Sequence, residues 1–176
     1  QGDLDVTLGA VVEMVHTASL VHDDIIDNAE MRRGKASINY GWGNHLTVLV
    51  GDYLYIRALD TALEAKSLDI LKTLSVATIR MTEGEILALE TNGRADLARD
   101  EYFDVIERKT AALFAASCRI PGFLAGHPEG DRLGEYGRFL GITFQLIDDV
   151  LDYTSSAEVL GKPVLSDLRE GKITRL

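Results

Sequence analysis

The sequence is short of several residue types, and each shortage excludes a class of protein. Its 176 residues include one cysteine, Cys118, which excludes an internal disulfide and a metal site built from several cysteines. Lysine and arginine together number 18 against 28 acidic residues, so the formal net charge is −10. This balance argues against a nucleic-acid surface and a polybasic membrane anchor. An anionic ligand must therefore be held by local basic groups or by metal ions.

Long hydrophobic runs are also missing. The longest candidate, residues 111–118, is ended by Arg119 and is too short to span a membrane. No signal-peptide pattern occurs, so we expect a cytoplasmic protein with no integral membrane segment. The four histidines occur at no recognised metal-ligand spacing and are expected to be structural; they are His16, His22, His45 and His127.

The apolar residues that are present follow a helical period. β-branched residues do not alternate as they would in strands, so the chain is predicted to be all-α. Gly51 and Gly84 are expected to let helices approach closely. Helices are predicted at residues 6–29, 44–65, 68–89, 101–118 and 131–152, with loops at 30–43, 92–100 and 126–130. Pro121 and Gly122 are expected to break the fourth helix.

Three carboxylates fall within five residues at the C-terminal end of the first predicted helix. Asp23 and Asp27 are four residues apart and share a face, while Asp24 is turned about 100° away. Like charges on one face repel, and the helix dipole adds to that cost. A hard cation such as Mg²⁺, which takes oxygen ligands, would relieve the repulsion. For this stretch alone, a solvated acidic face is the simpler alternative.

A second cluster repeats the first. Asp148 and Asp152 are four residues apart, as are Asp23 and Asp27. Asp149 directly follows Asp148, just as Asp24 directly follows Asp23. Two aliphatic residues again lie between the carboxylates, and both clusters end long apolar helices. This recurrence favours a functional pair: we expect two facing clusters that bind several Mg²⁺ around one diphosphate.

Basic residues accompany both clusters. Arg32 and Arg33 follow the first, and Lys162 follows the second. Arginine forks bind phosphate oxygens bidentately, so carboxylates, metal and arginines could together hold a diphosphate. Lys109 beside Thr110, flanked by small apolar residues, suits an anionic group at a cavity wall. Ordinary surface arginines paired with nearby acids are the alternative.

Two further acidic features have structural explanations. Asp52 lies within an apolar segment and is expected to be a buried acid satisfied by a hydrogen bond rather than a catalytic group. Glu83, Glu85 and Glu90 lie near one another on one predicted helix, and an exposed acidic face explains them as well as a functional role does.

The ordered set of motifs resembles the trans-isoprenyl diphosphate synthases, also called polyprenyl synthetases. Residues 16–27 with Arg32, Arg33 and Gly34 resemble the family's first aspartate-rich motif, and residues 144–152 resemble the second. Gly51-Asp52, Gly84-Glu85, Lys109-Thr110, Gly161-Lys162 and Asp167 with Gly171-Lys172 occur in the family's order. The resemblance implies an isoprenoid-synthase-type helical bundle with a central cavity. It covers residues 1–176 as a single domain.

The resemblance also implies an activity and a set of metal ligands. The family condenses isopentenyl diphosphate head-to-tail with an allylic diphosphate to give an all-trans polyprenyl diphosphate. Three Mg²⁺ ions hold the allylic diphosphate. By this resemblance Asp23 and Asp27 would bind two ions and Asp148 the third, with Asp24, Asp149 and Asp152 in supporting roles.

Substrate contacts follow from the same resemblance. Arg32, Lys109 and Lys162 would grip the allylic diphosphate, Arg33 would contact isopentenyl diphosphate, and Lys172 completes the expected substrate-binding set. Thr110 and Gln145 are the neutral oxygens placed to ease the allylic cation, and with Lys109 they form the expected catalytic set. The proton is expected to leave with the departing diphosphate, so no side chain acts as a nucleophile.

Product length is expected to depend on the helix that precedes Asp23. Ala18 and Ser19 lie one to two turns from the first cluster, where aromatic residues close the product tunnel in short-chain members of the family. Both are small here, which predicts a product longer than farnesyl or geranylgeranyl diphosphate. Met14 and Val15 are expected next along the wall. A bulky residue on another helix is the alternative floor.

Several departures and alternatives accompany the resemblance. The family's upstream Gly-Gly-Lys-Arg-type segment and its last helices are absent, so we expect an incomplete bundle, a fragment of a longer protein. A short-chain synthase, a class I terpene cyclase, a non-catalytic partner subunit and an acidic helical interaction protein are the competing functions. The intact second acidic cluster argues against a cyclase and against a decayed partner subunit. A homodimer is expected from the family.

Overall fold

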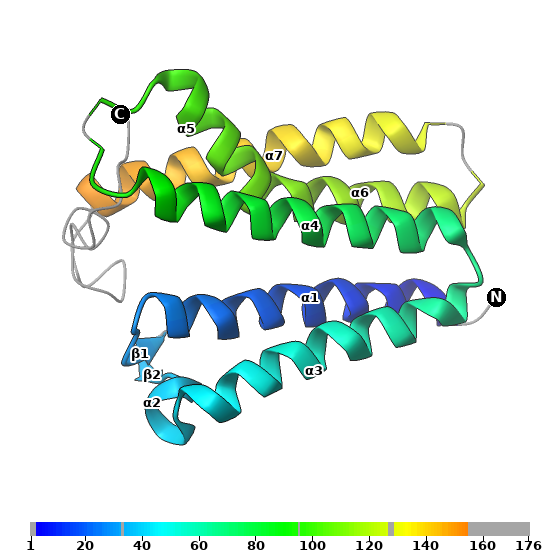
Figure 1. The fold of residues 1–176 in the computed structure, drawn as a ribbon. Coiled ribbons are helices and arrows are strands. Elements are labelled where there is room, and N and C mark those ends of the chain that lie inside the picture. The colour runs from blue at the N-terminus through cyan, green and yellow to red at the C-terminus, as the bar shows by residue number, and fades with distance from the viewer. Residues whose placement is uncertain (1–2, 33, 95, 127–128, 155–176) are drawn as a thin grey trace. The chain divides into compact units, whose positions relative to one another are not determined.

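The computed structural model describes residues 3–32, 34–94, 96–126 and 129–154, almost all of them helical (Figure 1). The predicted all-α class is confirmed. The chain forms two compact units, residues 1–72 and residues 73–176, and each is described by itself.

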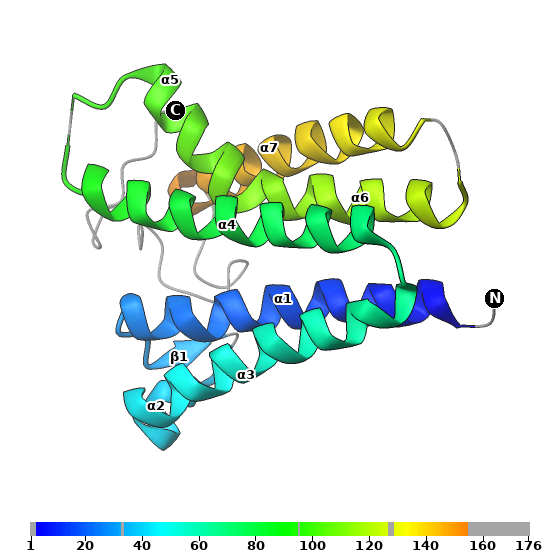
Figure 2. The ribbon, with the colours of Figure 1, turned by 45° about the vertical axis from the view of Figure 1, so that its right-hand side comes forward.

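In the first unit two long helices run side by side (Figures 1 and 2). A short hairpin and a short helix connect them. The elements are α1 (Leu4–Ile26), β1 (Met31–Arg32), β2 (Lys35–Ala36), α2 (Ile38–Trp42), α3 (Asn44–Ala62) and a 3₁₀ turn, η1 (Leu63–Ala65).

α1 has one buried stripe. Leu8, Val11, Val15 and Ala18 recur at spacings of three and four residues and are each at most 2% exposed. A Cβ on Gly51 of α3 would lie 2.9 Å from Cε1 of His22 and closer still to two other ring atoms. The predicted close approach of helices at Gly51 is therefore confirmed.

α1 is also, among the described residues, the one helix long and apolar enough to cross a membrane by length and composition alone. The expectation that residues 111–118 are the longest candidate for a membrane span is wrong. The core helix of a soluble protein and a signal sequence pass the same test, and 28% of the apolar window of α1 is buried.

The C-terminal end of α1 is a Schellman motif. Asn28 has φ 49°, its N–H donates to the carbonyl of Ile25 at 3.2 Å, and the N–H of Ala29 donates to the carbonyl of Asp24 at 2.9 Å. Asparagine tolerates the left-handed conformation that stops a helix. α1 therefore ends at Ile26, earlier than predicted, and Asp27 is its C-cap.

Residues 30–43, predicted as a loop without strands, contain a two-residue hairpin and α2 instead. Met31 pairs with Ala36 and Arg32 with Lys35, with Gly34 at φ 77° in the turn. Sequence periodicity cannot reveal such short elements, because each covers little more than one helical or strand repeat, too short for a period to show.

The second unit is built on a helix pair and a continuous bent helix. α4 (Leu68–Thr91) begins in the first unit and continues into the second. α5 (Arg99–Ile106), a π-helical turn η2 (Glu107–Ala111) and α6 (Ala112–Leu124) follow one another directly, and α7 (Gly130–Thr154) packs along α6 (Figure 2).

Pro121 does not break the fourth helix as predicted, because α6 continues through it to Leu124. Gly122 serves packing: a Cβ there would lie 2.6 Å from the Cα of Gly130 at the start of α7. Gly141 of α7 likewise leaves room for Ala111, whose Cα would be 2.6 Å from an added Cβ. These glycines bring α6 and η2 close to α7.

A small apolar cluster joins α5 to α7. Leu97, Tyr102 and Ile106 are each at most 5% exposed, with Ile142 and Leu146 packed against them. The cluster buries the ring of Tyr102 near the last turns of α7, where the second acidic cluster lies.

Candidate active site

The first acidic cluster binds an arginine through one of its carboxylates. Asp24 is 4% exposed, and its Oδ1 accepts from Nε of Arg32 at 2.7 Å and lies 2.5 Å from Nη2. The pKa of Arg32 is raised, first by the hydrogen bond to Asp24 and further by the negative charges of Asp24, Asp23 and Asp27. Arg32 therefore lies within the field of all three carboxylates. The first strand of the hairpin delivers it there.

A second set of side chains from α2 and the preceding turn closes the end of α1. Nδ2 of Asn39 donates to the carbonyls of Asp24 and Ala29, at 3.1 Å each. The hydroxyl of Ser37 donates to the carbonyl of Ala29. The carbonyl of Asp24, which already accepts from the N–H of Ala29, thus gains a second donor, and the carbonyl of Ala29 accepts from two side chains. The segment after α1 thus folds back over the first cluster.

α3 contributes further neighbours of the first acidic cluster. Burial and the negative charge of Asp23 raise the pKa of Tyr55 to about 12. Nε2 of His22 is 3.2 Å from the carbonyl of Val48 and 3.4 Å from Oδ1 of Asp52, and its ring packs on that of Tyr55. The prediction that Asp52 is buried is wrong, because its side chain is 54% exposed.

The second acidic cluster is held by a chain of hydrogen bonds. Tyr102 donates its hydroxyl proton to Oδ2 of Asp149. Nε2 of Gln145 donates to the other oxygen of Asp149 at 2.8 Å, and the hydroxyl of Thr110 donates to Oε1 of Gln145 at 2.7 Å. Burial raises the pKa of Asp149, while both accepted hydrogen bonds oppose that rise. Thr110 and Gln145, both named in the expected catalytic set, are hydrogen-bonded to each other although they lie 35 positions apart in the chain.

The six aspartates divide by burial. Asp24, Asp149 and Asp152 are buried, and Asp152 is fully so. Asp23, Asp27 and Asp148 are partly exposed. Equivalent positions of the two clusters therefore share the same burial at Asp24 and Asp149, which are both buried. They differ at the last position, because Asp27 is partly exposed and Asp152 is buried.

Lys109 lies on the π-helical turn and forms an ion pair with Glu85 of α4. The two helices approach closely there, because a Cβ on Gly84 would lie 2.7 Å from the Cα of Lys109. The sequence did not reveal that Glu85 is a partner of Lys109, because an exposed acidic face explained Glu85 equally well. Its side chain is only 15% exposed. The pairing of glycine and glutamate at 84 and 85 was the available signal.

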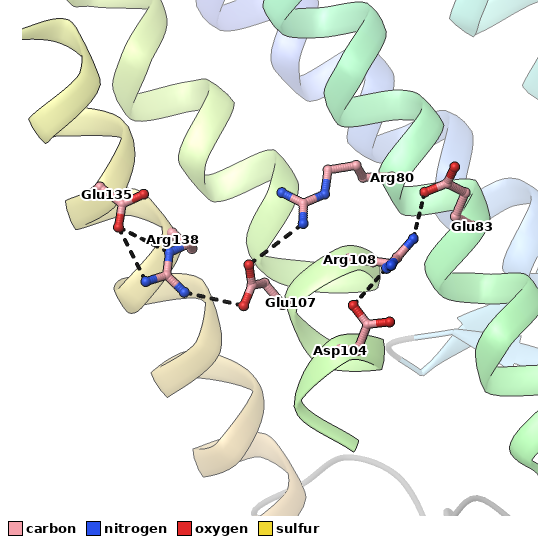
Figure 3. Close-up of polar contacts among 7 residues, drawn as sticks. All are labelled: Arg80, Glu83, Asp104, Glu107, Arg108, Glu135 and Arg138. Atoms are coloured by element: carbon pink, nitrogen blue, oxygen red, sulfur yellow. Dashed lines mark hydrogen bonds and ion pairs between the residues drawn. The ribbon is translucent and has the colours of Figure 1, made fainter. Parts of the chain in front are cut away.

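Ion pairs hold the π-helical turn from three helices (Figure 3). Glu107 lies 3.6 Å from Arg80 of α4 and 3.2 Å from Arg138 of α7. Arg108 pairs with Glu83 of α4 at 2.9 Å and with Asp104 of α5 at 2.8 Å. π-Helical turns are frequent at functional sites, and this one presents Lys109 and Thr110.

The remaining predicted residues fall in two groups. Ala18 is fully buried in the stripe of α1, whereas Met14 and Ser19 are partly exposed. The hydroxyl of Ser19 donates to the carbonyl of His16 at 2.8 Å. Arg33, Lys162 and Lys172 lie outside the described residues, as does His127.

Within the described part of the chain, no three histidine, cysteine or acidic side chains already converge on one cation position. The donor chemistry nonetheless fits a hard divalent cation, since each cluster offers only carboxylate oxygens. Each unit supplies part of the predicted ligand set.

Comparisons with known proteins identify the family. The Polyprenyl synthetase family model matches residues 3–176. The octaprenyl diphosphate synthase of Escherichia coli (strain K12) is 47% identical over 99% of this chain and 54% of that protein. The all-trans-nonaprenyl-diphosphate synthase (geranyl-diphosphate specific) of Rhodobacter capsulatus is 43% identical over 95% of this chain and 52% of that protein.

A solved structure shares the fold. The polyprenyl synthase of Caulobacter crescentus CB15, complexed with calcium and isoprenyl diphosphate, superimposes with a TM-score of 0.91 at 42% identity. The match covers 96% of this chain and 52% of that one. The chain thus spans about half the length of the relatives it matches. With a family model matched over residues 3–176, the chain belongs to the polyprenyl synthetase family.

Proposed function

We propose that the complete protein containing this chain condenses isopentenyl diphosphate with an allylic diphosphate, head to tail, into an all-trans polyprenyl diphosphate. Family membership and the names of the relatives support the class of reaction. The observation that carries the proposal is the hydrogen bond between Thr110 and Gln145, one turn before the second acidic cluster. Two neutral oxygens beside an acidic cluster suit a reaction that separates a diphosphate from a cation.

Both acidic clusters would serve the diphosphate through Mg²⁺. Asp23, Asp27 and Asp148 are the proposed ligands of three ions, and their partial exposure supports that role. Asp24, Asp149 and Asp152 are buried and would act by holding the ligands in place. Bound Mg²⁺ would neutralise charge that develops on the leaving diphosphate.

Basic side chains would complete the grip on the two substrates. Lys109 and Arg32 already have carboxylate partners, Glu85 and Asp24, which fix where each positive charge lies before substrate arrives. Lys162 for the allylic diphosphate, and Arg33 and Lys172 for the remaining substrate contacts, are carried from the family resemblance.

The allylic cation would be eased by Thr110 and Gln145. The hydroxyl proton of Thr110 is already donated to Gln145, so lone pairs on both oxygens remain available. The double bond of isopentenyl diphosphate then forms the new carbon–carbon bond, and the proton lost from the adduct goes to the departing diphosphate. No step requires a side-chain nucleophile.

We propose a product longer than geranylgeranyl diphosphate. Ala18 and Ser19 are small, and relatives with 47% and 43% identity are named for eight-unit and nine-unit products. Met14 would lie further along the same wall of the tunnel. The single-domain organisation over residues 1–176 is retained as part of this proposal.

A homodimer in the cytoplasm completes the proposal. Leu49, Tyr53 and Ile56 recur on one face of α3 and are each more than 60% exposed. A face of this kind suits a second copy, because large apolar side chains gain most when they are covered. Sedimentation analysis of the complete protein should give a dimer, and Ile56→Glu should give a monomer.

Incorporation of labelled isopentenyl diphosphate into an allylic primer tests the function. The complete protein should form acid-labile product with Mg²⁺ and none after chelation, and chromatography of the dephosphorylated product should show chains longer than twenty carbons. Release of a hydrocarbon or alcohol instead would indicate a cyclase. Failure to react without a second polypeptide would indicate a partner subunit.

A further inference from the structure

The buried hydroxyl of Tyr102 has no part in the proposed chemistry, yet it donates to a carboxylate of the second acidic cluster. Tyr102 is 4% exposed, and its ring lies in the apolar cluster with Leu97 and Ile106. Its hydroxyl donates to Asp149, 47 residues away on α7. A buried hydroxyl without a partner costs free energy, so this bond fixes where the carboxylate lies.

Asp149 in turn determines how the amide of Gln145 is turned. A carboxylate accepts hydrogen bonds and donates none, so the edge of Gln145 that faces Asp149 must be its NH₂ group. The amide oxygen is then directed to Thr110, from which it accepts. If the amide were reversed, a donor would occupy the position of the oxygen and would repel a cation.

We propose that Tyr102 is a positioning residue for prenyl transfer: by holding Asp149, it keeps the amide oxygen of Gln145 turned toward Thr110 and the allylic cation. This inference rests on the proposed function, because it assigns Gln145 and Thr110 the task of easing that cation. All four residues belong to the second unit. The chain of bonds runs from Tyr102 through Asp149 and Gln145 to Thr110.

Tyr102→Phe in the complete protein tests the role, since it removes one oxygen and keeps the ring. The bond at stake is charge-assisted, so kcat should fall about tenfold. The KM for each diphosphate should stay within twofold, because Tyr102 touches neither. Tyr136→Phe is the matched control on α7: its side chain is 63% exposed, and both constants should remain unchanged.

A double variant separates positioning from general stabilisation. In a Gln145→Leu background the amide is gone, so adding Tyr102→Phe should lower kcat by less than twofold further. Independent multiplication of the two losses would overturn the proposal, as would a Tyr102→Phe enzyme with kcat within twofold of wild type. If the wild-type protein does not elongate a primer, the proposed function fails; if it does and Tyr102→Phe matches it, only this inference fails.

A second measurement needs no variant and covers the case in which Tyr102→Phe does not fold. In wild-type protein carrying ¹⁵N in its glutamine side chains, the NH₂ protons of Gln145 should exchange with solvent at least tenfold more slowly than those of free glutamine. Exchange at the rate of free glutamine would show that the amide is not held, and would overturn the proposal.

Discussion

The ammonium group of Lys109 is paired with the carboxylate of Glu85, across a contact that only glycine at position 84 permits. The pair is partly buried, with side-chain exposures of 30% and 15%. Glu85 therefore holds the lysine charge at one place on the π-helical turn before any anionic substrate binds. α4 thus contributes to the site although none of its residues belongs to the predicted catalytic set.

Glu85→Gln should weaken binding of the allylic substrate. A neutral amide at position 85 no longer fixes the rotamer of Lys109. The entropy cost of ordering the lysine side chain must then be met when the substrate binds. We expect the KM for the allylic diphosphate to rise about fivefold, a change of roughly 1 kcal/mol in binding. Steady-state kinetics at saturating isopentenyl diphosphate measure it. Glu90→Gln is the matched control: it is an exposed glutamate on the same helix, and its KM should equal that of wild type.

Gly84→Ala should displace the π-helical turn itself. The added Cβ would lie 2.7 Å from the Cα of Lys109 and 2.9 Å from the carbonyl carbon of Arg108, and backbone cannot yield as a flexible side chain can. Overpacking of this kind costs about 1–3 kcal/mol, so the urea midpoint and kcat should both fall.

Gly9→Ala in α1 is the control for the same chemical change. A Cβ at Gly9 meets nothing within 4 Å, and alanine favours a helix, so stability should rise by up to about 1 kcal/mol. Equal behaviour of the two variants would mean that the close approach at Gly84 has no energetic consequence.

Glu107→Gln should loosen the turn by removing a carboxylate that serves two arginines. Arg80 and Arg138 lie 3.6 Å and 3.2 Å from its oxygens (Figure 3). Partly exposed pairs contribute about 0.2–1 kcal/mol each, so the unfolding free energy should fall by about 1 kcal/mol at low salt and by less at high salt. Glu135→Gln, which removes one pair at a 62% exposed carboxylate, should cost less. Identical losses that do not respond to salt would contradict this account.

Sequence reasoning succeeded where apolar residues repeat at a helical period. The helices around α3, α4 and α7 have long amphipathic patterns, and their predicted bounds lie within a few residues of those observed. Gly51 and Gly84 were correctly expected at close contacts. Thr110 and Gln145 were named as members of one catalytic set, but their hydrogen bond to each other was not predicted.

It failed where the outcome depends on tertiary partners. Pro121 was expected to end a helix on local propensity, but the helix continues and Gly122 packs against Gly130. The partners of Glu85 and Tyr102 lie far along the chain and carry no local signal. Asp52 was predicted to be buried from its apolar neighbours in sequence, although more than half of its side chain is exposed beside His22.

Tyr55 should make stability fall steeply at high pH. The folded state keeps its phenol neutral up to a pKa of about 12, whereas the unfolded state releases the proton near 10. Between these values the unfolded state binds fewer protons, so the unfolding free energy decreases as pH rises. Urea titrations at pH 9 and pH 11 should show a loss that is smaller in Tyr55→Phe. The phenol is partly solvated, so the difference should be at most about 1 kcal/mol. Parallel losses in the two proteins would assign the effect to other groups.

Product length provides a test that separates two neighbouring residues of α1. Ala18 is fully buried in the stripe of α1, so Ala18→Phe must first displace packed side chains and should destabilise the fold by about 1–3 kcal/mol. Ser19 lies about 100° around the helix and is partly exposed, so Ser19→Phe can place its ring without that disruption. We expect Ser19→Phe to keep near wild-type stability while shortening the main product by several isoprene units. Ser19→Ala controls for loss of the hydroxyl bond to His16 and should leave the product unchanged. If Ser19→Phe folds, turns over and still makes the wild-type chain length, the floor of the tunnel is set by another helix.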